Sequence, residues 1–148
     1  MSYRGKFSPR NPAKYRGDVT NITYRSLWER QFFRWLDEQS FVKCWSSEET
    51  VIPYRCKTDG QIHRYFVDVK MEFTDGRVFL IEIKPQRETE PPVNPGRKTK
   101  RYITEVMTYA KNTSKWEAAR EYAADRGWHF EVWTENTLKK LGIKLLTS

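Results

Sequence analysis

Two carboxylates and one amine lie in the part of the chain with the strongest β-strand character. Asp68 belongs to the first of two strand-like runs between Arg64 and Lys84, and Glu82 belongs with Lys84 to the second. Paired carboxylates with room for water suit a hard divalent cation, Mg²⁺ or Mn²⁺, which also takes phosphate oxygens as ligands. Such an ion polarises a phosphate and lowers the pKa of its bound water, while a nearby ammonium orients that water. These residue types therefore indicate phosphodiester hydrolysis.

The loop Thr74-Asp75-Gly76 decides whether the two carboxylates meet. A two-residue turn would place Asp68 opposite Ile83, with Glu82 on the other face. A three-residue loop, with Gly76 in the left-handed position of a G1 bulge, places Asp68 opposite Glu82. We prefer the second register because burial of one face fixes the register of a hairpin. This register collects apolar residues on one face: Val67, Val69, Met71, Phe73, Phe79, Ile81 and Ile83.

A third carboxylate, Glu29, lies at the start of a predicted helix from Ser26 to about Gln39. The apolar residues of this segment recur with helical spacing and define one face: Trp28, Phe32, Trp35 and Leu36. Ser26 and Glu29 fit the N-cap and N3 positions of a capping box, which explains Glu29 structurally. Glu29 also borders the buried face and could lean over the sheet beside the other two acids. Both interpretations stay open at this level.

The remaining patterns predict a sheet covered by helices. In chain order they indicate one or two strands in 41–56, a loop rich in Pro and Gly in 90–96, a helix through 103–110, a second helix from Ser114 to Gly127, a strand over 128–132 and a short helix over 134–141. With the first helix and the hairpin, this order favours the α/β class, with a mixed β-sheet flanked by helices.

A chain of 148 residues is expected to form one domain. Residues 1–20 show neither helical nor strand periodicity, so we expect a flexible basic N-terminal arm followed by a single domain over residues 21–148. The basic residues of this arm are Arg4, Lys6, Arg10, Lys14 and Arg16.

Charge and composition narrow the classes of partner. Lys and Arg number 27 against 19 Asp and Glu, a net charge of +8, which favours nucleic acid first and an anionic membrane surface second. The longest apolar run, Val78–Ile81, is far too short to span a membrane, and no secretory signal is visible, so we expect a reducing cytosol. Two Cys and two His residues exclude a disulfide scaffold and a convincing four-ligand zinc centre.

Three short segments carry a resemblance to a known superfamily. They are Ser26-x-x-Glu29, Tyr65-Phe66-Val67-Asp68 and Ile81-Glu82-Ile83-Lys84. Together they resemble the PD-(D/E)xK, restriction-endonuclease-like nucleases, and within these the endonuclease subunits of heteromeric transposases and the head completion nucleases of T-even-like tailed phages. The opening segment 1–6 and the segment 24–30 look closest to the phage nucleases. One departure is Val67, which stands where the superfamily name has Pro; many members lack that Pro.

The resemblance implies a restriction-endonuclease-like fold and a Mg²⁺-dependent endonuclease, with Mn²⁺ as a substitute. It implies Asp68, Glu82 and the main-chain carbonyl of Ile83 as metal ligands, Lys84 as the group that positions the attacking water, and Glu29 as a catalytic acid near the metal. It further implies DNA as substrate, phage capsid, portal or neck proteins as partners, and action in the host cytoplasm during phage assembly, in association with the virion. Neither a membrane nor a small-molecule cofactor is expected.

Basic residues that follow the second strand are candidates to hold DNA together with the N-terminal arm: Arg87, Arg97, Lys98, Lys100 and Arg101. Such contacts would be directed to phosphates, so we expect weak sequence preference. Two alternatives remain open. One is a non-enzymatic DNA-binding or virion assembly protein on the same fold, and the other is a junction resolvase or a transposase endonuclease subunit.

Overall fold

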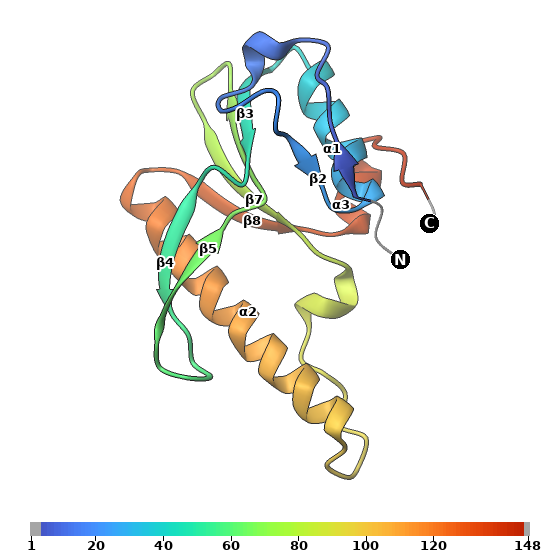
Figure 1. Cartoon of the computed structure of the whole chain (residues 1–148), viewed down its shortest axis with the longest axis vertical. Helices are drawn as coiled ribbons and strands as arrows, with labels where there is room; N and C mark the ends of the chain where they lie inside the picture. The colour runs from blue at the N-terminus through green and yellow to red at the C-terminus, as the bar shows by residue number, and fades with distance from the viewer. Residues whose placement is uncertain (1–3, 147–148) are drawn as a thin grey trace.

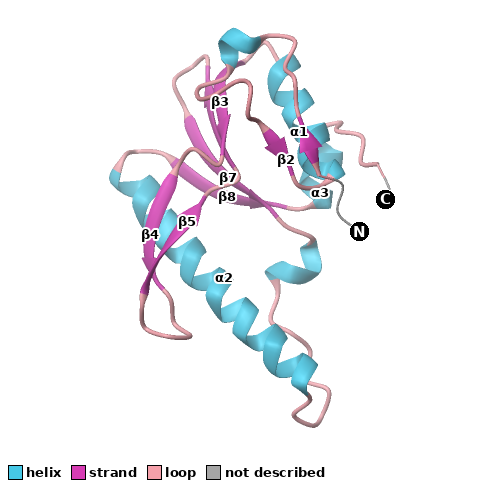
Figure 2. Ribbon diagram, viewed as in Figure 1, coloured by secondary structure: helices cyan, strands magenta, loops and turns pink. Residues whose placement is uncertain are grey.

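A computed structural model describes residues 4–146 of the chain. Its centre is a four-stranded sheet in the order β3-β6-β7-β8. Strand β6 (Val69–Phe73) runs antiparallel to both of its neighbours, β3 (Val42–Ser47) and β7 (Val78–Ile83), whereas β8 (His129–Trp133) pairs with β7 in parallel. Helices flank this mixed sheet (Figures 1 and 2), which confirms the predicted α/β class.

The two faces of the sheet are covered by different helices. On one face, α1 (Leu27–Glu38) and α3 (Glu135–Lys140) enclose a core that includes Phe32, Leu36, Met71, Ile81 and Leu138. On the other face, α2 (Lys100–Asp125) packs Ala119 and Ala123 against Leu80. Residues 78–82 of β7 are buried throughout because this strand lies between the two cores. The N-terminal half of α2 projects beyond the sheet (Figure 1).

The β6–β7 hairpin has the register predicted from its loop. Val69 pairs with Ile81 and Met71 with Phe79, which puts Asp68 and Glu82 at the next opposed position. Gly76 has φ 94°, and its N–H donates to the carbonyl of Phe73 at 3.0 Å, as a left-handed residue in a three-residue loop allows. The prediction that this loop brings the two acids to the same end of the hairpin is confirmed.

The first β-rich run is not one strand, as its sequence pattern suggested, but two. Strand β5 (Ile62–Phe66) pairs with β4 (Val51–Arg55) in a separate two-stranded ribbon, and the chain bends at Val67-Asp68 before β6 begins. Val67 therefore packs in the core on the α2 side with Leu80, and the expectation that it shares a face with Val69 was wrong. The bend leaves Asp68 at a junction of two strand pairs.

Helix α2 is continuous, whereas two helices were expected here. Ser114 does not open a second helix: its hydroxyl donates to the carbonyl of Ala110 at 2.9 Å and accepts the N–H of Lys57 at 3.1 Å. A mid-helix Ser that bonds back to the preceding turn leaves the helical ladder intact. The helix ends before Gly127, which has φ 73°, and Thr134 caps α3, as the sequence predicted.

Residues 4–20 pack on the domain and do not form the separate, flexible arm that was expected; residues 1–3 lie outside the described residues. Strand β1 (Gly5–Lys6) pairs with β2 (Thr23–Tyr24), and the ring of Phe7 meets Phe33 edge-on with centroids 5.7 Å apart. After the short 3₁₀ helix η1 (Pro12–Lys14), Tyr15 is only 6% exposed. The sequence pattern missed these aromatic anchors because they lie among Gly, Pro and basic residues.

A second 3₁₀ helix, η2 (Gln86–Thr89), follows β7 and leads into the loop before α2. No helix within residues 4–146 is long and apolar enough to cross a membrane.

Candidate active site

Asp68 and Glu82 lie at the end of the β6–β7 hairpin, where their environments differ. Oδ2 of Asp68 accepts the main-chain N–H of Ile83 at 2.8 Å. Glu82 is only 6% exposed, and its Oε1 accepts the hydroxyl of Tyr65 at 2.6 Å. The pKa of Tyr65 is raised by burial and by the Glu82 charge, so the phenol keeps its proton and acts as a donor. The bend before β6 and the register of the hairpin thus bring the two predicted acids together.

Lys84 follows Glu82 by two residues and lies on the same side of the strand. Its Nζ is 3.8 Å from Oε2 of Glu82, a distance at which an ion pair forms but is not tight. Burial raises the pKa of Asp68 well above its ordinary value, and the charges of Glu82 and Glu29 act in the same direction. The Ile83 N–H and the Lys84 ammonium oppose that rise. Lys84 is therefore loosely paired with Glu82, and its charge also acts on Asp68.

Glu29 lies in the first turn of α1, but its side chain does not close the expected capping box on the N–H of Ser26. Its N–H donates to the Ser26 hydroxyl at 3.2 Å, which makes Ser26 the N-cap of α1, and its Oε2 accepts the N–H of Arg25 at 3.2 Å. Burial raises the pKa of Glu29 to about 7, with the Glu48 and Glu82 charges adding to the rise. The first turn of α1 thus places a third carboxylate close enough to Asp68 and Glu82 for their charges to interact.

Arg25 and Glu48 form an ion pair beside these acids. The guanidinium of Arg25 makes two hydrogen bonds to the Glu48 carboxylate, at 3.0 and 3.1 Å. Glu48 has φ 56°, a left-handed conformation that is uncommon outside Gly, and its N–H donates to the Asp68 carbonyl at 3.2 Å. Strained residues of this kind occur often at functional sites. The main chain of Asp68 is therefore held from the β3–β4 turn.

Helix α2 contributes Lys115 from the opposite side. Its Nζ lies 5.6 Å from the centre of the Tyr65 ring. Burial lowers the pKa of Lys115, and the Glu82 and Asp68 charges counter that effect. No sequence pattern pointed to Lys115, because only the path of α2 across the sheet brings it to the hairpin. Tyr65 stands in one of the motifs that carry the superfamily resemblance, but its hydrogen bond to Glu82 was not predicted.

Comparison with known proteins identifies the family of this chain. Residues 39–135 match the family model described as TnsA-like endonuclease N terminal. The chain belongs to this family of TnsA-like endonucleases. It is also 48% identical over 148 residues to the head completion nuclease of Enterobacteria phage T4, in an alignment that covers 97% of this chain and 99% of that protein. No solved structure matches the chain significantly. The family supports the restriction-endonuclease-like fold expected from the motifs.

In this TnsA-like endonuclease, Asp68 and Glu82 offer the carboxylate oxygens that a hard divalent cation takes as ligands, and Glu29 lies close enough for its charge to act on Asp68. All three side chains offer carboxylate oxygens, and the burial and like-charge repulsion that raise the pKa values of Asp68 and Glu29 are the costs that a bound cation relieves. The N–H of Ile83 donates to Asp68, and the role expected for the Ile83 carbonyl stays a prediction. The hairpin and the bend at Asp68 thus bring Asp68, Glu82, Ile83 and Lys84 together, and α1 places Glu29 close enough for its charge to act on Asp68.

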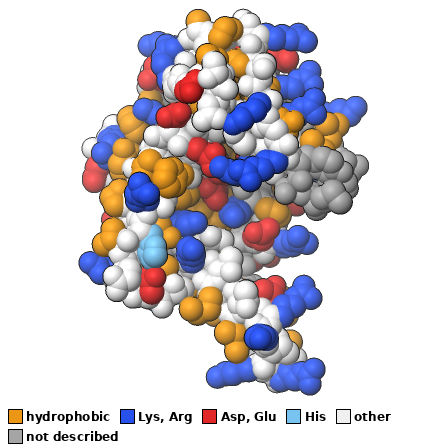
Figure 3. Space-filling view, viewed as in Figure 1, with side chains coloured by type: hydrophobic (Ala, Val, Ile, Leu, Met, Phe, Trp, Pro, Cys, Tyr) orange, Lys and Arg blue, Asp and Glu red, His pale blue; other side chains and the backbone are white. Residues whose placement is uncertain are grey.

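The basic residues predicted to hold DNA divide into two groups. Lys6 and Arg10 lie in a cleft beside α1, together with Arg30 and Arg34 of that helix. Arg87 and Arg101 face a second cleft between η2 and the projecting end of α2. The other exposed candidates are Arg4 and Arg16 in the N-terminal segment and Arg97, Lys98 and Lys100 before or at the start of α2. Figure 3 shows Lys and Arg side chains on the main body of the domain and also on the projecting end of α2.

Lys14 stands apart from these candidates. Its Nζ donates to three main-chain carbonyls at the C-terminus of α1, those of Leu36 at 2.8 Å, Asp37 at 3.0 Å and Gln39 at 2.8 Å. An ammonium has three N–H donors, so these contacts use all of them. Lys14 caps the helix instead of presenting its charge to a polyanion, contrary to its expected place among the phosphate-binding residues.

Proposed function

We propose that this protein is a Mg²⁺-dependent endodeoxyribonuclease, with Mn²⁺ as a substitute, that hydrolyses phosphodiester bonds. The observation that carries the proposal is the convergence of Asp68, Glu82 and Lys84 at the end of the hairpin, with Glu29 close enough to raise the pKa of Asp68. Buried carboxylates whose pKa values are raised by neighbouring negative charges are costly unless a cation or a catalytic role compensates.

In this proposal Asp68, Glu82 and the Ile83 carbonyl hold the ion, and Glu29 is the catalytic acid next to it. When bound, the ion supplies Lewis acidity and a water of lowered pKa. Tyr65 fixes the orientation of Glu82 through its hydrogen bond, and the Arg25–Glu48 pair fixes the position of the Asp68 main chain through Glu48. Lys84 orients the attacking water and neutralises charge that develops on the phosphate oxygens.

The exposed basic residues hold the DNA backbone in this proposal. The group beside α2 comprises Arg87, Arg97, Lys98, Lys100 and Arg101, and the group beside α1 comprises Arg4, Lys6, Arg10 and Arg16. Lys14 is left out because its donors are used within the fold. Phosphate contacts carry no sequence information, so cleavage should depend on DNA structure more than on sequence.

The biological setting rests on the relative from phage T4, whose name describes a nuclease of head completion. We infer that this chain acts on DNA at the same stage of assembly, in the cytoplasm of an infected host and in association with the virion. Capsid, portal or neck proteins are the partners that this setting predicts. The inference is supported by the extent of the similarity, which covers nearly the whole of both chains.

The test is cleavage of linear, circular and branched DNA by purified protein with Mg²⁺, comparing the natural sequence with Asp68→Asn. The TnsA-like family match favours one alternative, a transposase-type endonuclease, and a junction-resolving endonuclease is a further alternative. Exclusive cleavage of branched DNA would support that alternative. A complete lack of cleavage with Mg²⁺ or Mn²⁺ would instead favour a non-enzymatic DNA-binding or assembly protein.

A further inference from the structure

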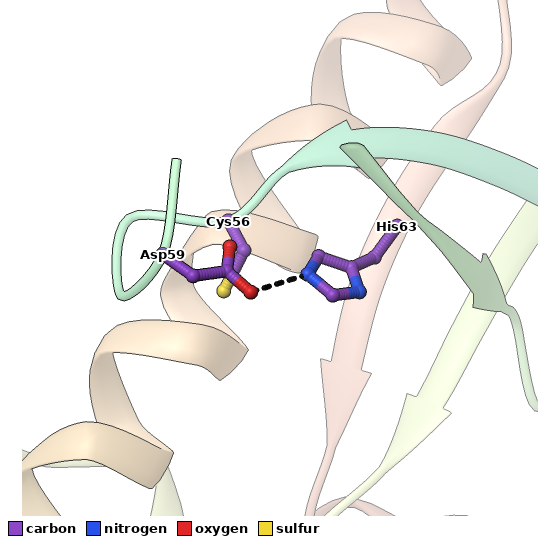
Figure 4. A group of neighbouring side chains, drawn as sticks. All are labelled: Cys56, Asp59 and His63. Carbon is purple, nitrogen blue, oxygen red and sulfur yellow. Dashed lines mark hydrogen bonds and ion pairs between the residues drawn. The ribbon is translucent and has the colours of Figure 1, made fainter. Parts of the chain in front are cut away.

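A second group of metal-ligating side chains lies outside the nuclease site, at the loop of the β4–β5 ribbon. Cys56 directly follows β4, Asp59 stands in the loop, and His63 lies near the start of β5. One ligand atom from each of the three residues lies within 4.8 Å of the others. Figure 4 shows the sulfur of Cys56 beside the carboxylate of Asp59, whose other contact is with the imidazole ring of His63. Nε2 of His63 is 2.8 Å from Oδ2 of Asp59.

The loop holds these three ligands in place without help from a metal. The N–H of Cys56 donates to the Gln61 carbonyl at 2.9 Å, and the N–H of Gly60 donates to the Cys56 carbonyl at 2.8 Å. Oδ1 of Asp59 accepts the N–H of Gln61 at 2.9 Å, so Oδ2 is the oxygen that turns toward His63. His63 is fixed by its pairing with Tyr54 across the ribbon. The backbone of the loop is therefore ordered before binding, and an ion would replace the hydrogen bond between Asp59 and His63 with one bond to each residue.

The donor atoms select the kind of ion. A thiolate, an imidazole and a carboxylate are ligands for Zn²⁺, whereas Mg²⁺ takes oxygen ligands and would avoid the sulfur. We propose that Cys56, Asp59 and His63 bind one Zn²⁺ ion, with water as the fourth ligand. The cysteine and histidine counts that exclude a four-ligand Cys/His centre are compatible with this three-ligand site.

The proposed zinc site lies in a ribbon and loop that contact both Glu82 and α2. Two residues beyond His63 along β5, Tyr65 donates its hydroxyl to Glu82. On the other side of the loop, the N–H of Lys57 bonds to Ser114 at 3.1 Å and Nζ of Lys57 pairs with Glu117 at 2.9 Å, which ties the loop to α2. A bound ion would fix the ribbon that carries Tyr65, so zinc should raise the thermal stability of the folded protein.

The test is titration of the purified full-length protein with Co²⁺, whose bond to a cysteine thiolate gives a charge-transfer absorption band in the near ultraviolet. The chain offers matched controls, because it contains one further cysteine, Cys44, and one further histidine, His129. The band should saturate at one equivalent and disappear on addition of Zn²⁺. It should persist in Cys44→Ser and His129→Ala, be absent from Cys56→Ser, and require at least ~10-fold more Co²⁺ in His63→Ala.

Several results distinguish metal binding at this site from metal binding at the nuclease site, and loss of a ligand from a folding defect. The band should be unchanged by millimolar Mg²⁺ and in Asp68→Asn, and Zn²⁺ at ~100 times its Kd should raise the Tm of the natural sequence by about 5 °C or more. Because Cys56 is only 1% exposed and its variant could fail to fold, His63→Ala with an unchanged circular dichroism spectrum is the second variant. A missing band in the natural sequence, or an equal affinity in folded His63→Ala, would overturn the proposal.

Discussion

The main-chain N–H of Ile83 donates a 2.8 Å hydrogen bond to the carboxylate of Asp68. This bond joins the bend before β6 to the last residue of β7, so the position of Asp68 relative to Glu82 does not depend on side-chain packing alone. An N–H donor favours the charged form of a carboxylate, so this bond opposes the rise in the pKa of Asp68 that burial and the Glu82 charge cause. The bond therefore holds the Asp68 carboxyl group beside the strand that carries Glu82.

Replacement of Lys84 by Ala should reduce Mg²⁺-dependent cleavage by about 10²–10³-fold, because the variant lacks the charge that stabilises developing negative charge at the phosphate. DNA affinity and thermal stability should change little, since the 3.8 Å contact with Glu82 is a loose one. Single-turnover cleavage rates measure this effect. Lys43→Ala is the matched control, because Lys43 is an exposed lysine of β3 that pairs with Glu72. Equal rates in the two variants would remove Lys84 from the catalytic set.

Tyr65→Phe should weaken Mg²⁺ activation by about 10–100-fold, as is typical when the group that orients a metal ligand is removed. The variant leaves Oε1 of Glu82 without its 2.6 Å donor while keeping the aromatic ring in the core. The Mg²⁺ concentration for half-maximal cleavage measures the change. Tyr54→Phe, on the neighbouring strand of the same ribbon, should leave that concentration unchanged. A change of stability alone in Tyr65→Phe would assign Tyr65 a structural role only.

Without divalent ions, the free energy of unfolding should fall as the pH rises from about 4.5 to about 7. The pKa of Glu29 is raised from 4.5 to about 7 by burial, so in this window the unfolded chain loses its proton while the folded chain keeps it. The fall should be on the order of 2 kcal/mol and should end above pH 7. Urea unfolding at several pH values measures it. The fall should shrink in Glu29→Gln, and a stability that rises through the window would contradict the assignment.

Combined replacement of Arg97, Lys98 and Arg101 by Gln should weaken DNA binding about equally for all sequences. It should also reduce the slope of log affinity against log salt, by up to ~0.9 for each phosphate that the variant no longer neutralises. Fluorescence anisotropy at several salt concentrations measures both effects. Lys139→Gln with Lys140→Gln on α3 is a control for the change in net charge. An unchanged salt slope in the Arg97, Lys98 and Arg101 variant would exclude this segment from the DNA-binding surface.

Lys14→Met should destabilise the fold by about 1–3 kcal/mol and leave the salt slope of DNA binding unchanged. Its ammonium is bonded to three carbonyls at the end of α1, and removal of a charged donor leaves those acceptors without a partner. Denaturant unfolding and the same anisotropy titration measure the two properties. A normal stability with a reduced salt slope would return Lys14 to the DNA-binding group.

The parts of the site that sequence could predict are those that local rules determine. Gly76 fixes the loop and therefore the register that opposes Asp68 to Glu82, and Ser26 fixes the start of α1 and therefore the place of Glu29. Each of these signals lies within a few residues of its consequence. The α/β class followed in the same way from the order of helical and strand patterns.

The parts that sequence did not predict depend on contacts between distant segments. The break between β5 and β6 exists because β5 pairs with β4. Lys115 lies near Tyr65 because of the path that α2 takes across the sheet. The packing of residues 4–20 likewise depends on Phe7 and Tyr15 reaching Trp45 of β3. Local periodicity contains no record of such long-range partners.

The most direct test of the nuclease proposal is the rate of Mg²⁺-dependent DNA cleavage by Asp68→Asn compared with Asp75→Asn. Asp75 lies in the loop at the opposite end of the same hairpin, where it pairs with Arg77 at the surface, so both variants remove one carboxylate from one structural unit. We predict that the natural sequence and Asp75→Asn cleave at similar rates, and that folded, DNA-binding Asp68→Asn is slower by at least ~10³-fold. Cleavage by Asp68→Asn at the natural rate would contradict the proposal.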